Sequence, residues 1–231
     1  MIYFEKRKTP PPSLAIEKAK GTENYRGQDV IDALSEDFKA KCYLCGTKWP
    51  TGINVEHFDE HRGDRNKMFD WNNLFYACAH CNNTKNSLFR TVPSNLLNCT
   101  IEDHKVDYWI EYRLEGDEKL KNLKADIRRN SKVPATPHED KIANTIRLLQ
   151  LIYNSIGTPI KNEESYNIIN QINEELKDFL TLLDDYCFAN SETEKNNARV
   201  SIISSLENDK PYTAFKKWII RDLLLEKEFE V

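Results

Sequence analysis

Two pairs of cysteines constrain the fold of this chain more than any other feature of its sequence. Each pair has Cys-x-x-Cys spacing, and 32 residues separate the pairs, which are Cys42 with Cys45 and Cys78 with Cys81. Two-residue spacing lets both thiolates of a pair bind one tetrahedral ion, and four thiolates fill the shell of a structural zinc without leaving a position for water. The spacing therefore predicts one structural Zn²⁺ that ties the two pairs together.

The alternatives for these cysteines are a pair that stays reduced and metal-free, or a redox-active pair. His80 lies between Cys78 and Cys81 and could compete as a zinc ligand, but four thiolates need no further donor. Cys99 and Cys187 stand alone in the sequence, and we interpret both as small buried side chains.

Composition bounds the classes of protein that remain. The chain has 231 residues, of which 39% are hydrophobic, so it can bury one or two cores. No apolar run approaches the ~20 residues that span a bilayer, and the N-terminal stretch MIYFEKRKTPPP has no apolar signal core, so we expect a cytoplasmic location.

The charge is distributed unevenly along the chain, whose net charge is −4. Residues 1–92 contain 14 Lys and Arg against 12 Asp and Glu, a net charge of +2, whereas residues 93–231 contain 19 against 25, a net charge of −6. A free-standing nucleic-acid binder is usually basic. The first segment is therefore the better candidate for contact with phosphate groups.

Hydrophobic periodicity predicts an α+β fold that is mostly helical. Strict alternation of apolar and polar residues over 106–114 predicts a strand with one buried face, and the charged stretch 115–135 reads as a solvated connector. From residue 136 onward four amphipathic stripes predict a small bundle of helices. The expected domains are a zinc-containing unit with an N-terminal arm at 1–92, a strand and connector at 93–135, and a helical domain at 136–231.

The residues between the two cysteine pairs carry the strongest sign of chemistry. Residues 52–58, GINVEHF, read as a short strand that ends in an acid and a histidine, and Asn73 comes shortly before the second cysteine pair. Asn82 follows that pair directly, and Lys85 lies three residues further on. In order, spacing and residue type, residues 42–86 resemble the HNH endonucleases, a family with a zinc-braced ββα-metal core.

The resemblance implies a role for each residue of the motif. Glu56 and Asn82 would be the protein ligands of one catalytic Mg²⁺ or Mn²⁺, which prefer oxygen donors. His57 would be the general base, because a neutral imidazole can take a proton from the attacking water. Asn73 would brace the loop that carries these groups.

Basic side chains near the motif are expected to bind the substrate. They are Lys85, Arg62 and Arg65. Residues 58–60 read Phe-Asp-Glu where many HNH proteins have an Ile-x-Pro-like turn, so the course of this loop stays open. The residues whose roles stay open with it are Asp59, His61 and Asp64.

Weaker similarities extend over most of the chain. They lie in residues 1–14, 32–45, 144–150 and 212–217 and resemble the PtuB family, the HNH nuclease subunits of Septu anti-phage systems that also occur beside some retrons. The resemblance implies an ATPase partner of PtuA type, with a retron reverse transcriptase and its RNA–DNA hybrid as an optional third component. The helical domain would bind this partner.

Two functions from different classes follow from these patterns. The first is a metal-dependent HNH endonuclease that cleaves nucleic acid, DNA before RNA or tRNA, as the effector of an anti-phage complex. The second is a non-catalytic zinc module that binds nucleic acid or protein. The segment from Pro211 to Val231 is the expected docking helix, because its apolar residues exceed one narrow stripe.

Overall fold

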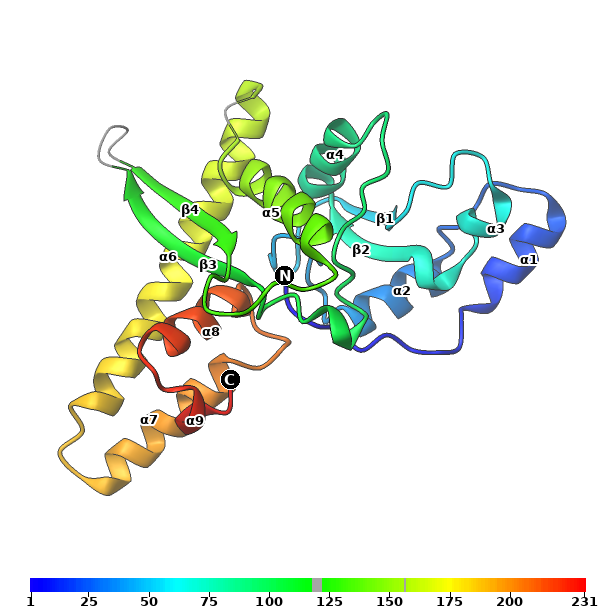
Figure 1. Cartoon of the computed structure of the whole chain (residues 1–231). Coiled ribbons are helices and arrows are strands. Elements are labelled where there is room, and N and C mark those ends of the chain that lie inside the picture. The colour runs from blue at the N-terminus through cyan, green and yellow to red at the C-terminus, as the bar shows by residue number, and fades with distance from the viewer. Residues whose placement is uncertain (118–121, 156) are drawn as a thin grey trace.

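The computed structural model describes residues 1–117, 122–155 and 157–231. These residues form an α+β fold, about half of it helical, with two small antiparallel sheets (Figure 1). The broad fold class is as the sequence predicts. In chain order the described elements are α1 (Pro12–Lys20), α2 (Gln28–Asp37), β1 (Ile53–His57), α3 (Arg65–Met68), the 3-10 helix η1 (Trp71–Asn73), β2 (Leu74–Cys78), α4 (Ala79–Leu88), the 3-10 helix η2 (Glu102–His104), β3 (Ile110–Asp117), β4 (Asn122–Arg129), α5 (Glu139–Tyr153), α6 (Pro159–Cys187), α7 (Glu192–Ser205), α8 (Thr213–Asp222) and α9 (Glu226–Phe229).

Strands β1 and β2 form the first sheet, and α4 follows β2 without a loop. The strands pair antiparallel, with Glu56 opposite Phe75 and His57 opposite Leu74. All five residues of β2 are buried, because α2 and α4 both pack against this strand. Successive side chains of a strand point to opposite faces, so Glu56 and His57 project from different sides of the sheet.

Strands β3 and β4 form the second sheet, and part of it lies where the sequence predicts a connector. The antiparallel register runs from Ile110 opposite Arg129 to Asp117 opposite Asn122. The strand predicted at 106–114 therefore begins at Ile110, after a turn. The prediction of a connector at 115–135 is wrong for β4, where Ala125 and Ile127 are buried between charged neighbours.

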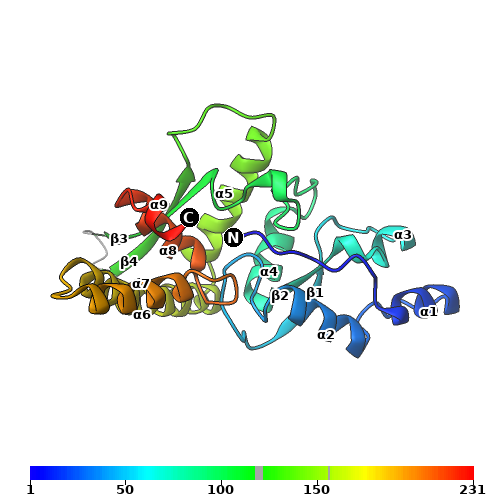
Figure 2. The ribbon, with the colours of Figure 1, turned by 90° about the horizontal axis from the view of Figure 1, so that it is seen from below.

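The helices after residue 136 differ from the predicted four-helix bundle. α5 packs against α4 and β4, and α8 packs against β3, so both helices contact the second sheet. α6 and α7 pack on each other and extend away from the first sheet, as Figure 2 also shows. An apolar stripe predicts a buried face, but not whether a helix or a strand covers it. None of the described helices is long and apolar enough to cross a bilayer.

The predicted docking helix from Pro211 to Val231 is divided into α8 and α9. Leu224 takes the left-handed conformation at φ 58°, and the Leu225 N–H donates to the Ile220 carbonyl at 3.0 Å, which closes the end of α8. The aromatic side chains of this segment are in the core and cannot meet a partner. They are Tyr212, Phe215, Trp218 and Phe229.

One cluster of buried side chains contains residues from all three expected domains, including Phe4, Leu34, Ile127 and Trp218. The domain boundaries themselves stay predictions. The N-terminal arm joins this cluster through Lys6, whose Nζ donates to the Leu74 carbonyl at 2.5 Å and to the Trp71 carbonyl. Burial lowers the pKa of Lys6 to about 7.

Candidate functional site: a cysteine cluster and a histidine

The two predicted cysteine pairs meet in one buried cluster. The Sγ atoms of Cys42, Cys45, Cys78 and Cys81 all lie within 4.8 Å of one another. A turn before β1 supplies the first pair, the end of β2 supplies Cys78, and the first turn of α4 supplies Cys81. Four clustered thiols are the donor set of a closed tetrahedral zinc site, so the arrangement is compatible with the predicted structural Zn²⁺.

The turn with the first pair, residues 41–47, is held by contacts with residues far along the chain. Lys41 Nζ donates to the Asn208 carbonyl at 3.1 Å and to the hydroxyl of Thr213 at 3.2 Å. The Tyr153 hydroxyl donates to the Cys45 carbonyl at 3.0 Å. We call residues 41–47 the knuckle, and its contacts place the cysteine cluster at the junction of the first sheet with α5 and α8.

The other cysteines and His80, which could bind zinc through sulfur or nitrogen, are not part of the cluster. Both ring nitrogens of His80 are engaged: Nδ1 lies 2.9 Å from a carboxylate oxygen of Glu164, and Nε2 lies 2.9 Å from the Ile152 carbonyl. His80 therefore fastens α4 to α5 and α6 and is not available to the cluster. Cys99 is buried as predicted, whereas the prediction for Cys187 is wrong, because this residue is exposed at the end of α6.

Glu56 is buried at 3% exposure and forms an ion pair with Lys85 from α4, which is at 0%. Lys85 Nζ also donates to the carbonyls of His57 at 2.8 Å and Phe58 at 2.7 Å. The second carboxylate oxygen of Glu56 has no hydrogen-bond partner among the described residues. Burial raises the pKa of Glu56, and the charge of Lys85 opposes this rise.

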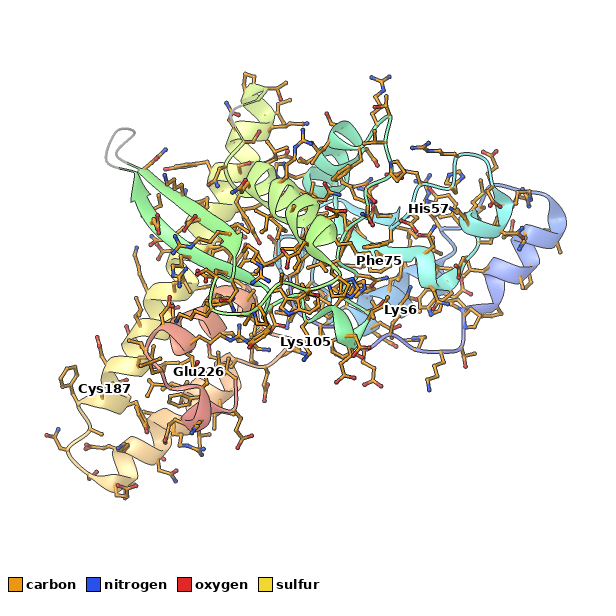
Figure 3. All side chains as sticks on the ribbon, viewed as in Figure 1. Lys6, His57, Phe75, Lys105, Cys187 and Glu226 are labelled. Atoms are coloured by element: carbon orange, nitrogen blue, oxygen red, sulfur yellow. The ribbon has the colours of Figure 1, made fainter. Side chains whose placement is uncertain are left out.

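His57 ends β1 and is half-buried on the other side of the sheet from Glu56. Its Nε2 lies 3.0 Å from the Met68 carbonyl, which can only accept, so Nε2 carries the proton. Burial lowers the pKa of His57 to about 4, and the imidazole is neutral at pH 7. No described residue forms a hydrogen bond with Nδ1, whose lone pair can accept a proton. Figure 3 shows His57 at the end of the molecule that carries α1 and α3.

Sequence reasoning missed the aromatic neighbour of His57. The ring of Tyr25, from the loop between α1 and α2, lies 4.4 Å from the His57 ring, centroid to centroid, at an angle of 62°. The ring of His61 lies 4.6 Å away. Tyr25 is 32 residues before His57 and belongs to no pattern of the sequence, so only the fold could reveal this contact.

Asn73 braces the loop after His57, as the resemblance implies. Its Oδ1 accepts from the Asp59 N–H at 2.7 Å, and its Nδ2 donates to the carbonyls of Asp59 at 2.8 Å and Lys67 at 3.1 Å. One buried amide thus fixes both ends of the loop that contains His61 and Asp64. Asp64 itself caps α3 through the Asn66 N–H and has a local structural role.

Replacing Asn73 by Ala is expected to destabilise the protein by about 3 kcal/mol, because three hydrogen bonds are lost and the loop carbonyls stay buried. For a chain of this size the corresponding fall in Tm is roughly 6–12 °C. Thermal unfolding followed by circular dichroism measures this. Asn72→Ala is the matched control, because Asn72 is exposed, and it should change Tm little. An equal fall in Tm for both variants would contradict the role of Asn73 in holding the loop.

The three residues expected to bind substrate have different surroundings. Arg62 is exposed. Arg65 donates to the carbonyls of Thr22 at 2.9 Å and Lys18 at 2.8 Å, so it fastens the end of α1. Lys85 is fully buried with Glu56, which excludes the expected contact of its ammonium with a phosphate in this arrangement.

The ligand set that the resemblance implies for a catalytic Mg²⁺ or Mn²⁺ does not fit this geometry. One oxygen of Glu56 is bound by the Lys85 ammonium, which would repel a divalent cation beside it. Asn82, half-buried on the first turn of α4, accepts from Asn86 at 3.3 Å through its Oδ1. Within residues 1–117, 122–155 and 157–231, only the cysteine cluster brings three or more His, Cys, Asp or Glu ligands together.

Comparison with known proteins gives no match to a protein family, to a curated protein or to a solved structure.

Proposed function

We propose that this protein is an endonuclease of the HNH type that hydrolyses phosphodiester bonds in nucleic acid, with His57 as the general base. The observation that carries the proposal is the state of His57. The Met68 carbonyl fixes its tautomer, and Nδ1 is left as a proton acceptor on a neutral ring. A histidine in this form can deprotonate a water molecule that attacks phosphorus.

The surrounding structure supports this role. Two antiparallel strands followed directly by a helix, with four cysteines beside them, have the element order of the family that residues 42–86 resemble. Asn73 holds the loop after His57, and Tyr25 restricts the ring. The negative charge of a bound phosphate would raise the pKa of His57 toward neutrality, which strengthens it as a base.

Cleavage assays test the proposal directly. Purified protein is incubated with plasmid DNA and with total RNA, in Mg²⁺, in Mn²⁺ and in EDTA, alone and with an ATPase of the PtuA type that the resemblance implies. We expect cleavage of DNA that depends on His57, and the comparison of Mg²⁺ and Mn²⁺ with EDTA measures whether the reaction needs a divalent ion. No cleavage of either nucleic acid under all these conditions would favour the non-catalytic zinc module instead.

We also propose that an ATPase subunit is the partner, as the wider resemblance implies, and that the protein acts in anti-phage defence. The net charge of −6 over residues 93–231 disfavours independent binding to nucleic acid, which fits a nuclease that another subunit brings to its substrate. With the aromatic residues of α8 buried, the docking candidates in this segment are reduced to Leu223 and Leu224, which are 52% and 77% exposed.

Replacing Leu223 and Leu224 together by Asp is expected to abolish co-purification with the ATPase and to end phage protection, because buried carboxylates weaken an apolar interface. Leu224 is in the left-handed region, where Asp is tolerated, so the fold should persist. The matched control replaces Ile160 and Val200, which are 71% and 60% exposed, by Asp. Retained co-purification by the Leu variant would place the interface elsewhere.

A further inference from the structure

The contacts of Lys85 do not resemble those of a residue that binds a substrate. Its Nζ lies inside the protein, with Glu56 as the counter-ion and with the carbonyls of His57 and Phe58 as further acceptors. An ammonium group has three donors, and these three partners use all of them. Lys85 therefore connects α4 to the end of β1 at His57, whose ring contacts His61 in the loop after the strand.

The carbonyls that Lys85 binds have no partner in the β1–β2 ladder beyond the end of the strand. β1 ends at His57, and the Phe58 N–H donates to the Asn73 carbonyl at 2.9 Å. The Phe58 carbonyl also accepts from the Ser94 hydroxyl at 3.3 Å, so without Lys85 it is the His57 carbonyl that would lose its described side-chain partner, beside a buried carboxylate. Since buried polar groups need partners, the ammonium adds a constraint on the backbone of His57 to the one that its pairing with Leu74 provides.

The buried charges explain why Glu56 is at this position. A single buried ammonium is strongly unfavourable, and a carboxylate in contact offsets its desolvation. The Tyr43 hydroxyl is also buried nearby, and the negative charge of Glu56 contributes to a raised pKa of Tyr43 after burial itself. No described contact links Glu56 to solvent or to the loop that carries His61.

We propose that Lys85 is a positioning residue that holds the backbone of His57, and that Glu56 is its buried counter-ion and not a ligand of a divalent ion. The part that concerns catalysis depends on the proposed nuclease function. The claim that Glu56 and Lys85 form a buried ion pair does not depend on it, so either claim can fail without the other.

A double-mutant cycle tests the ion pair without any assay of activity. Glu56→Gln and Lys85→Met each leave one buried charge without its partner, and each is expected to lower Tm by roughly 10 °C at pH 8. The double variant leaves neither charge, so its Tm loss should be smaller than the sum of the two single losses. A Tm loss in the double variant equal to the sum of the two single losses would overturn the ion pair of Glu56 with Lys85.

The position of His57 is tested by NMR of its ring protons, which the nearby Tyr25 ring is expected to shift. Lys85→Met is expected to move these signals, and the matched control Lys67→Met, at an exposed lysine, should leave them in place. Unmoved signals in a folded Lys85→Met protein, with zinc content retained, would overturn the positioning role.

If the protein cleaves nucleic acid, kinetics test two points. The first is whether Lys85 positions His57, and the second is whether Glu56 binds a divalent ion. Lys85→Met should lower kcat by about 10- to 100-fold with KM nearly unchanged, as a displaced base affects the chemical step. Glu56→Gln should leave the apparent Mg²⁺ constant within about twofold, whereas loss of a metal ligand raises it by about tenfold or more. A tenfold rise in the apparent Mg²⁺ constant of Glu56→Gln would show that Glu56 is a ligand of the divalent ion. An inactive parent protein would contradict the nuclease function and leave the thermal and NMR tests decisive.

Discussion

Serine at Cys78 is expected to leave most of the protein insoluble or unfolded. The four Sγ atoms lie within 4.8 Å of one another in the interior, where a tetrahedral ion can bind them all. A structural zinc contributes about 10–16 kcal/mol of apparent binding free energy, which is as large as the ~5–15 kcal/mol that stabilises a typical domain. Loss of one thiolate weakens this binding, and we expect the loss of free energy to be large enough to unfold most chains.

Metal analysis checks the premise of this prediction. Purified protein should contain close to one zinc per chain, and prolonged chelation should unfold it, with the loss of ellipticity following the loss of metal. Cys187→Ser is the matched control, since Cys187 is exposed, and this variant should keep its zinc and its Tm. A metal-free protein that is fully folded would contradict the zinc site.

Alanine at His57 is expected to lower the cleavage rate by about 10²- to 10⁴-fold, the usual contribution of a general base. Zinc content should stay the same, because the cysteine cluster does not contact His57 through any described hydrogen bond. Tm should change only modestly, because the ring is half-buried and, among the described residues, has one hydrogen bond, to Met68. Cleavage by His57→Ala at the rate of the parent would place the base elsewhere.

The pH dependence of cleavage provides a second check on His57. Its pKa of about 4 lies below the ordinary value of 6.5, so the free protein should keep its base in the neutral form down to about pH 4. We expect kcat/KM to fall on the acid side near pH 4 and not near pH 6.5. The unfolded chain binds the proton more tightly, so stability should also decrease as pH falls from 6.5 toward 4.

The parts of the site that follow from short-range spacing were predictable from the sequence. Two Cys-x-x-Cys pairs can bind one metal ion together in many different folds, and the structure confirms that their thiols cluster. The α+β class followed from periodicity in the same way. Asn73 was expected to brace a loop, and its three hydrogen bonds are those of a brace.

The environment of each side chain could not be predicted, because other elements supply it. Helical spacing from Asn82 places Lys85 on one face of α4, but it does not show that β1 covers that face. β4 was missed because its buried residues, Ala125 and Ile127, are few and lie among charges. Both errors come from tertiary contacts, which local patterns do not encode.

The knuckle has a consequence for how the protein folds as it is synthesised. Its partners are distant in sequence: Tyr153 lies 108 residues after Cys45, and Asn208 lies 167 residues after Lys41. The four cysteines emerge from the ribosome long before these partners, so zinc can be bound while the knuckle is still open to water. During that interval the thiols are accessible to oxidants and to competing metals, and contacts of such long range form slowly. Metal supply during translation would then affect the yield of folded chains.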